Sequence, residues 1–253
     1  MLARVLTRQH VRAVYQPIVH LANRSVVGFE ALARPANVAD DGSVEEFFRT
    51  ARAQGVTRDL DWLCRRAALD GSRFMDVGPF LSLNLNPDAL QSADADAEAL
   101  VQLLVDAGRS MAATVVEVVR PASVPDVGAL MELLQPYRRR GVLIAVGVEE
   151  SDEDVLSSSV EQPDFVKLSR TVVAAMADPA QRGLAERTAA RALRGWPTPI
   201  AEGIEHEGMA QIVVATGIRL GQGYHLGRPA AMDREGRLLH SDAALPQAIQ
   251  GSG

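Results

Sequence analysis

Thr114-Val115-Val116-Glu117-Val118-Val119 is a nearly continuous run of β-branched residues. Such a run is typical of a strand whose two faces are both buried, as in the wall of a parallel barrel. Other apolar runs lie on both sides of it along the chain, and segments whose apolar residues recur at helical spacing separate them. Alternating strands and helices with short links indicate parallel strands joined by right-handed crossovers.

The strands that we expect lie at 11–21, 25–33, 80–86, 114–119, 142–148, 164–168, 198–204 and 219–224. The helices that we expect lie at 44–54, 58–69, 94–107, 127–140, 184–193 and 208–215. About eight strands favour a closed barrel over an open sheet. Only a few residues around Asn23 join the first two strands, which indicates a hairpin. The predicted fold class is therefore α/β, a modified TIM (β/α)8 barrel with one antiparallel strand.

A length of 253 residues is normal for a single α/β barrel. The pattern fades after Pro229, so we expect a barrel domain over residues 1–232 and a flexible C-terminal tail over residues 233–253. No apolar run approaches the roughly 18 residues of a membrane-spanning helix, and the N-terminus lacks the apolar core of a signal peptide. We therefore expect a cytoplasmic protein without a membrane partner.

The net charge of −6 argues against nucleic acid as a partner, although a local basic pocket is compatible with it. Cys64 is the single cysteine of the chain. It excludes an internal disulfide and any metal site built from several cysteines. Metal ligands, if the chain has them, must come from other residue types.

Polar residues occur at the ends of the predicted strands, where the active site of a parallel barrel lies. They are Glu30, Asn84, Asn86, Glu117, Lys167, Glu202, Glu205 and Gln222. Clustered carboxylates repel one another and are costly to desolvate, so they need a cation. Oxygen ligands from Glu and Asn suit Mg²⁺ or Mn²⁺, and a pair of such ions can brace an in-line displacement at phosphorus. Position alone thus suggests phosphoester hydrolysis, although many barrels gather acids at the mouth for other reactions.

Six segments, in order along the chain, carry a family resemblance that covers roughly residues 10–230. They are YQPIV at 15–19, GFEALAR at 28–34, LNLN at 83–86, DFVKL at 164–168, AEGIE at 201–205, and QGY at 222–224 with GRP at 227–229. The chain resembles the EAL-domain family of cyclic-di-GMP-specific phosphodiesterases. The resemblance implies a barrel that hydrolyses this bacterial second messenger to linear pGpG with Mg²⁺ or Mn²⁺.

The resemblance also assigns expected roles to residues of this chain. It implies metal ligands at Glu30, Asn84 and Glu117. It implies that Lys167 and Glu205 position or activate the attacking water. It places Gln16, Arg34 and Gln222 on the nucleotide side. Arg34 would lie near a phosphate, because a planar guanidinium pairs with phosphate oxygens.

The fifth predicted strand departs from the family, whose active members carry two consecutive aspartates at its end. Counting from Gly141 places Gly147 and Val148 at these positions, whereas counting back from Lys167 places Val146 and Gly147 there. Both carboxylates are missing by either count. The resemblance therefore implies that the second metal site is lost.

Other positions near the mouth also differ from the family pattern. Arg120 replaces the second acid of a Glu-x-x-Glu segment, and its guanidinium either joins the carboxylate cluster as a substitute cation or points to solvent. Glu149 and Glu150 lie one or two residues past the missing aspartates, where a side chain changes direction, so we do not expect them to replace these ligands. We expect Glu202 to be structural.

These features favour a degenerate EAL domain in bacterial cyclic-di-GMP signalling. It would be catalytically impaired and act as a nucleotide-binding or protein-interaction module, with a slight preference for a protein partner. The alternative is a slow metal-dependent phosphodiesterase that hydrolyses cyclic di-GMP to pGpG. A third hypothesis is a barrel enzyme that acts on another phosphoester. EAL domains commonly pair, so a homodimer is possible and the oligomeric state stays open.

Overall fold

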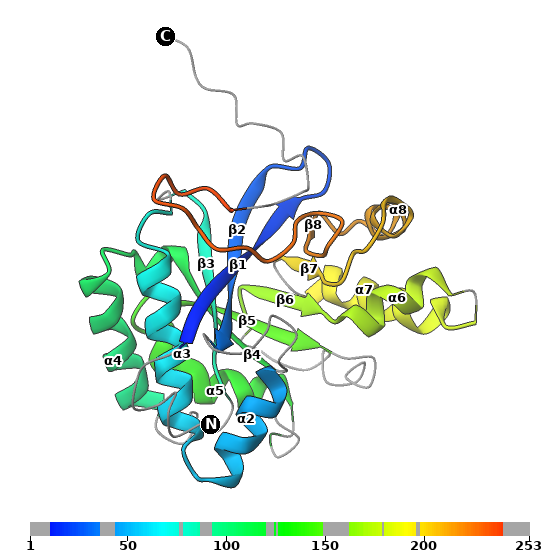
Figure 1. Ribbon diagram of the computed structural model, residues 1–253. Helices are drawn as coiled ribbons and strands as arrows, with labels where there is room; N and C mark the ends of the chain where they lie inside the picture. The colour runs from blue at the N-terminus through cyan, green and yellow to red at the C-terminus, as the bar shows by residue number, and fades with distance from the viewer. Residues whose placement is uncertain are drawn as a thin grey trace.

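The computed structural model describes residues 11–35, 44–75, 78–86, 93–119, 124, 126–148, 162–178, 180–195 and 198–239. Within these residues, the strands close into a barrel in chain order (Figure 1). They are β1 (Val11–His20), β2 (Val26–Pro35), β3 (Phe80–Asn84), β4 (Thr114–Val119), β5 (Leu143–Val148), β6 (Phe165–Leu168), β7 (Pro199–Ala201) and β8 (Leu220–Gly221). The predicted α/β barrel is confirmed, and each predicted strand overlaps one of these elements, with β2 ending two residues later than predicted.

β1 is the antiparallel strand that the short first connection predicted. It pairs antiparallel with β2 and with β8 and so closes the barrel, while β2 to β8 run parallel. The β1–β2 turn includes Arg24, which has a left-handed φ of 60°. In the hairpin register Gln16 lies opposite Glu30. Cross-strand partners share a face of the sheet, so both side chains point into the barrel.

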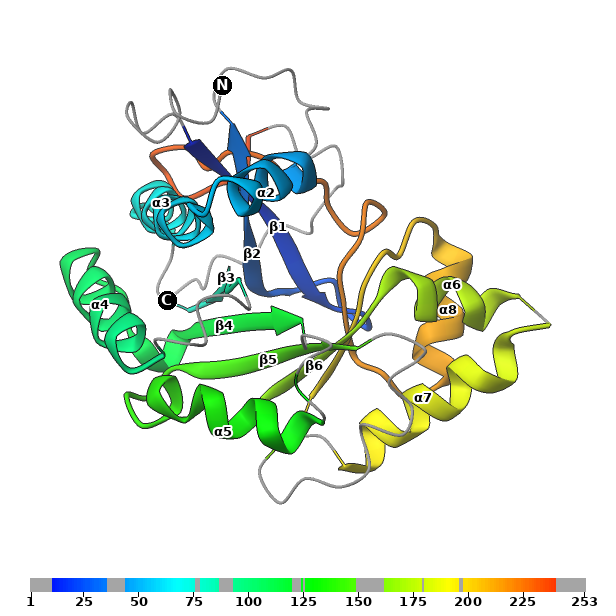
Figure 2. The ribbon, with the colours of Figure 1, turned by 90° about the horizontal axis from the view of Figure 1, so that it is seen from below.

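Helices surround the strands on the outside, as the view from below shows (Figure 2). They are α2 (Val44–Ala53), α3 (Thr57–Gly71), α4 (Ala93–Asp106), α5 (Val127–Arg138), α6 (Arg170–Ala177), α7 (Arg182–Gly195) and α8 (Glu207–Ala215), with the 3-10 turn η2 at Met111–Ala113. The main apolar core fills the layer between strands and helices. A second cluster around Ile18, Ile200 and Leu220 includes Phe80 and Phe165, whose ring centroids are 5.0 Å apart.

Helix α6 follows β6 directly and was not among the predicted helices. Its N-cap is Ser169, whose side chain accepts a hydrogen bond from the backbone N–H of Val172. This bond satisfies one of the free N–H groups of the first turn. Val172, Val173 and Met176 are buried on its inner face. The helix places Arg170, its first residue, beside the barrel mouth.

The chain after β8 returns to the barrel. Ala230 bridges to Tyr15, and Met232 bridges to Leu238. Residues 240–253 lie outside the described residues, and the domain boundary at residue 232 stays a prediction. In the part of the chain that the structure describes, no helix has both the length and the apolar character needed to cross a membrane.

Candidate active site at the barrel mouth

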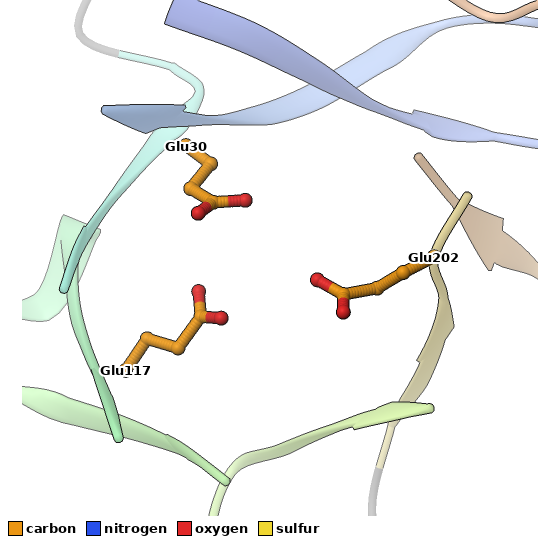
Figure 3. A group of neighbouring side chains, drawn as sticks. All are labelled: Glu30, Glu117 and Glu202. Atoms are coloured by element: carbon orange, nitrogen blue, oxygen red, sulfur yellow. The ribbon is translucent and has the colours of Figure 1, made fainter. Parts of the chain in front are cut away.

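Strand register brings the predicted site residues together at one end of the barrel. Asn84 on β3 lies opposite Glu117 on β4, and Glu30 on β2 lies opposite Ser82 on β3. Since side chains alternate along a strand, these positions face the barrel interior. Figure 3 shows Glu30, Glu117 and Glu202 pointing toward one another across the opening.

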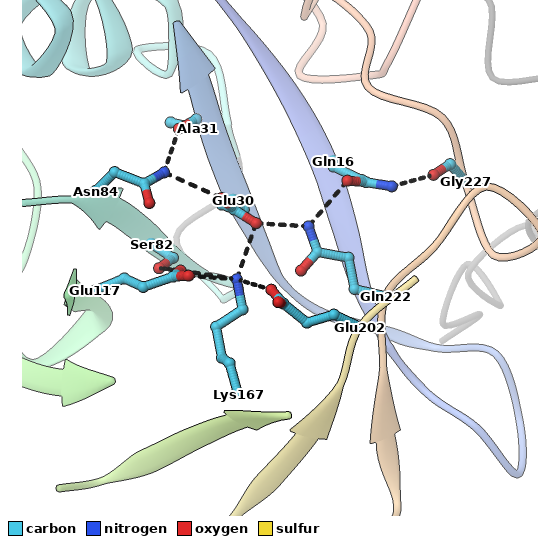
Figure 4. Close-up of polar contacts among 10 residues, drawn as sticks. All are labelled: Gln16, Glu30, Ala31, Ser82, Asn84, Glu117, Lys167, Glu202, Gln222 and Gly227. Carbon is cyan, nitrogen blue, oxygen red and sulfur yellow. Dashed lines mark hydrogen bonds and ion pairs between the residues drawn. The ribbon is translucent and has the colours of Figure 1, made fainter. Parts of the chain in front are cut away.

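Lys167 on β6 lies at the centre of these carboxylates (Figure 4). Its Nζ is 2.9 Å from Glu30 Oε2, 2.8 Å from both carboxylate oxygens of Glu117, and 2.6 Å from Glu202 Oε1. The lysine side chain is 1% exposed, and both Glu30 and Glu117 are buried. A single buried ammonium group thus donates charge-assisted hydrogen bonds to carboxylates from three different strands or strand ends.

Side-chain amides tie Glu30 to the strands that close the barrel. Asn84 Nδ2 donates to Glu30 Oε1 at 3.0 Å, and Gln222 Nε2 donates to Glu30 Oε2 at 2.7 Å. Gln222 Nε2 also donates to Gln16 Oε1 at 3.0 Å, and Gln16 Nε2 donates to the carbonyl of Gly227 at 3.1 Å. This network fixes the Glu30 carboxylate before any ligand binds.

Burial and neighbouring charges shift the pKa values of Glu117 and Glu30 in opposite directions. Burial, with the charges of the neighbouring carboxylates, raises the pKa of Glu117 to about 8 despite the Lys167 ammonium. Burial would raise the pKa of Glu30 too, but Lys167 and the amide hydrogen bonds hold that pKa below its ordinary value. The three carboxylates outweigh burial at Lys167 and raise the pKa of its ammonium well above the usual range. Burial thus favours the neutral form of Glu117, whereas the Lys167 ammonium and the amides favour the ionised form of Glu30.

The oxygen atoms of the cluster fit one divalent cation. Glu30, Glu117 and Glu202 each offer a carboxylate oxygen, and these atoms lie within 4.8 Å of one another. Mg²⁺ and Mn²⁺ take such oxygen ligands. Sequence reasoning assigned Glu202 a structural role, whereas the structure places it in this group. Its position directly after β7, at the carboxyl end of a barrel strand, was the available signal.

β5 contributes no side-chain oxygen to the mouth within residues 143–148. Ala145 lies opposite Glu117, and Gly147 lies opposite Lys167, so these two positions face the interior. Val146 and Val148 are buried in the outer core instead. Gly147 belongs to both alternative counts of the missing aspartates.

Arg120, Glu149 and Glu150, which carry three further sequence hypotheses, lie outside the described residues. The substitute-cation role of Arg120 and the exclusion of the two glutamates as ligands therefore stay predictions.

The remaining predicted residues line two pockets that flank the cluster. A cavity of about 560 Å³ is bounded by Arg34, Asn84 and Asn86, and it reaches Glu30 and Glu117. Arg34 donates from Nη1 to the carbonyl of Ala33 at 2.8 Å. This cavity extends from the acidic cluster to α2 and α3.

The second pocket has a volume of about 220 Å³ and includes Glu205, Arg170 and Tyr224 in its wall. Glu205 pairs with Arg170 Nη2 at 2.5 Å, on the rim and not at the Lys167 ammonium. Tyr224 is half-exposed, and the Arg228 guanidinium carbon lies 4.5 Å from the centre of its ring. This rim thus combines cationic, acidic and aromatic groups.

Sequence comparison places most of the chain in one family. The EAL-domain family profile matches residues 1–229. A curated relative, the uncharacterized protein y4lL of Sinorhizobium fredii, is 25% identical over 253 residues. That match covers 98% of this chain but 30% of the relative, so the chain spans less than a third of the relative's length.

Solved structures share the barrel. The PaMucR phosphodiesterase in complex with c-di-GMP is 20% identical and has a TM-score of 0.74, over 90% of this chain and 95% of that one. BlrP1 of Klebsiella pneumoniae, in a complex with manganese and cyclic di-GMP, is 25% identical and has a TM-score of 0.71, over 87% of this chain and 56% of that one. These likenesses show the shared fold, and the family match over residues 1–229, which include the whole barrel, shows that the chain belongs to the EAL-domain family.

Proposed function

We propose that this chain is a cyclic-di-GMP-binding EAL domain that has lost efficient hydrolysis of the nucleotide. One observation carries the proposal. The inward positions of β5 are Ala145 and Gly147, while side-chain amides of Asn84 and Gln222 hold the Glu30 carboxylate, and Gln222 also bonds to Gln16. The groups that would hold a nucleotide are thus present in the described residues, and β5 adds no metal ligand there.

The walls of the mouth suit a cyclic dinucleotide. Such a ligand presents phosphates and two bases, so it needs cations and flat surfaces on both sides of a centre. Arg34 lines one pocket and Arg170 the other, and a guanidinium pairs with phosphate oxygens through its planar fork. Tyr224 offers a half-exposed ring on which a base can stack.

The same geometry argues against fast turnover. Efficient in-line displacement at phosphorus commonly uses two metal ions about 3.5–4 Å apart. A divalent ion held by Glu30, Asn84 and Glu117 would polarise a phosphoryl oxygen. The chain itself would bind and orient the nucleotide; in the metal-free protein Lys167 holds Glu117 and Gln222 holds Glu30. Within the described residues, the acidic group at the mouth offers oxygens for one ion.

A slow one-metal phosphodiesterase is the second candidate. Glu202 favours it, because this residue adds a third carboxylate to Glu30 and Glu117. Binding of a protein partner, and pairing into a homodimer, remain predictions from the sequence.

Calorimetric titration of the purified protein with cyclic di-GMP, in EDTA and then in Mn²⁺, tests the proposal. We expect saturable binding that falls by about tenfold or more in Arg34→Ala, and an unchanged affinity in the control Arg73→Ala. Arg73 is exposed and pairs with Asp70 at 2.9 Å, away from the mouth.

Chromatography of the same mixtures detects pGpG. Absence of binding at about 0.1 mM nucleotide would refute the proposal. Rapid Mn²⁺-dependent pGpG formation that disappears in Glu30→Ala would favour a phosphodiesterase.

A further inference from the structure

The ammonium group of Lys167 lies among the carboxylates of the acidic cluster, in the position that a bound metal ion would occupy. We propose that its ammonium group is the resident counter-cation of Glu30, Glu117 and Glu202, and that a divalent ion enters only by displacing it. The metal affinity of the mouth is then set by Lys167. This inference rests on the metal site of the proposed function, and it concerns metal binding before any nucleotide is present.

The distances place the ammonium and the ion in competition. Nζ lies 2.6 to 2.9 Å from oxygens of all three carboxylates, and the cluster's oxygens lie within 4.8 Å of one another. An ion of the Mg²⁺ type draws its oxygen ligands to about 2.1 Å. It would need the same oxygens that now accept hydrogen bonds from Nζ, so one cation replaces the other.

Strand β5 does not relieve this competition. Gly147, directly opposite Lys167, has no side chain that could attract the ammonium away from the cluster or add a ligand for the ion. Asn84 and Gln222 bond to Glu30 but carry no charge. The ammonium therefore has three carboxyl groups as partners and no alternative side-chain partner on β5 within residues 143–148.

Because the acidic cluster is buried, loss of the Lys167 ammonium without a replacement cation is unfavourable. Lys167 is 1% exposed, and Glu30 and Glu117 are almost as deeply buried. Buried carboxylates without a cation are strongly unfavourable, so the cluster keeps the lysine until another cation takes its place. A lysine in this position lowers metal affinity without removing any metal ligand.

Mn²⁺ titration of the EDTA-treated, nucleotide-free protein tests the inference by calorimetry and by the electron paramagnetic resonance signal of free Mn²⁺. We expect Lys167→Met to bind Mn²⁺ at least about tenfold more tightly than the wild type. Arg170→Met is the matched control, since it removes one positive charge from the same mouth. Arg170 is 70% exposed and pairs with Glu205. Its affinity should stay within about threefold of the wild type.

A second comparison keeps the test valid if Lys167→Met folds poorly. Lys167→Met combined with Glu202→Gln removes one charge of each sign, and its Mn²⁺ affinity should exceed that of Glu202→Gln alone. Mn²⁺ should also raise the melting temperature of Lys167→Met more than that of the wild type. Unchanged or weaker Mn²⁺ binding in both lysine variants would overturn the inference. So would equal gains in Lys167→Met and Arg170→Met. Neither result would change the binding of cyclic di-GMP in EDTA. That titration therefore tests the proposed function independently of the Mn²⁺ titration.

Discussion

Gly147 on β5 lies directly opposite Lys167 on β6, and both positions face the interior of the barrel mouth. A carboxylate at position 147 would therefore stand beside the ammonium that now bonds to three glutamates. A Cβ added to Gly147 would meet Val119 Cγ2 at 3.2 Å, a tight contact with a half-exposed neighbour at a strand end. Because residue 147 has no side chain, β5 adds no negative charge beside Lys167 at this position.

We expect Gly147→Asp to increase Mn²⁺ affinity by about tenfold or more, because it adds an oxygen ligand and offers Lys167 another partner. Gly147→Asn is the control, since it has nearly the same shape without the charge. Calorimetric titration with Mn²⁺ measures the change. Equal affinities in the two variants would show that position 147 does not reach the metal site.

The raised pKa of Glu117 predicts how stability depends on pH. Its folded-state pKa of about 8 exceeds the ordinary value of 4.5, so the folded protein binds the proton more tightly than the unfolded chain. This contribution is complete below the ordinary pKa and is lost as the pH rises toward 8. We expect the free energy of unfolding of the metal-free wild type to fall between pH 5 and pH 8 by a few kcal/mol, as about 1.4 kcal/mol per pKa unit implies.

Glu117→Gln should lose most of this pH dependence, because the amide does not titrate. Urea unfolding in EDTA at pH 5 and at pH 8 measures the difference for both proteins. The lowered pKa of Glu30 acts in the opposite direction and below its ordinary value of 4.5, outside this window. A wild type whose stability is constant or rises from pH 5 to pH 8 would contradict the prediction.

Gln222→Leu should destabilise the fold and weaken nucleotide binding together. The amide donates to both Glu30 and Gln16, so its loss leaves buried acceptors without this donor. An unsatisfied buried polar group costs about 1–3 kcal/mol. Chemical denaturation and calorimetry with cyclic di-GMP report the two effects.

Gln211→Leu is the matched control for Gln222→Leu, since it makes the same change on the exposed face of α8. There the Gln211 amide reaches Glu207 at 3.4 Å. We expect its stability to change by less than about 0.5 kcal/mol. Equal losses of stability in the two variants would show that the buried hydrogen bonds of Gln222 contribute no more than those of an exposed glutamine.

Tyr224→Ala should weaken cyclic di-GMP binding with little loss of stability. The ring is half-exposed, so its removal empties little of the core, whereas stacking of a base on an aromatic ring contributes about 1–3 kcal/mol. Tyr224→Phe should bind almost as well as the wild type, because it keeps the ring. Calorimetry compares the three proteins, and a loss of affinity in the Phe variant equal to that in Ala would point to the hydroxyl and not to stacking.

The strands of the barrel could be predicted because each is an apolar or β-branched run between helical segments. Helix α6 was missed because its eight residues follow β6 with only Ser169, its N-cap, between them. β7 and β8 are shorter than their apolar runs, since backbone pairing ends before the apolar residues do.

The site could be predicted as far as strand register determines it. Glu30, Asn84, Glu117 and Lys167 lie on strands, where alternation fixes the direction of each side chain, and the structure brings them together as expected. Glu202 and Glu205 follow the end of β7, where alternation no longer applies. The sequence therefore could not tell that Glu202 turns inward to Lys167 while Glu205 turns to Arg170.

The hydrogen bond between Gln222 and Gln16 joins residues 206 positions apart in the chain. It crosses the seam where β8 meets β1, so it forms only after the ring of strands is complete. Contacts of such sequence separation are made late, because a long loop must close first. During synthesis, a nascent chain that has not reached β8 already contains Glu30, Glu117 and Lys167 but cannot orient Glu30 through Gln222. The mouth becomes competent to hold a ligand only when the last strand is in place.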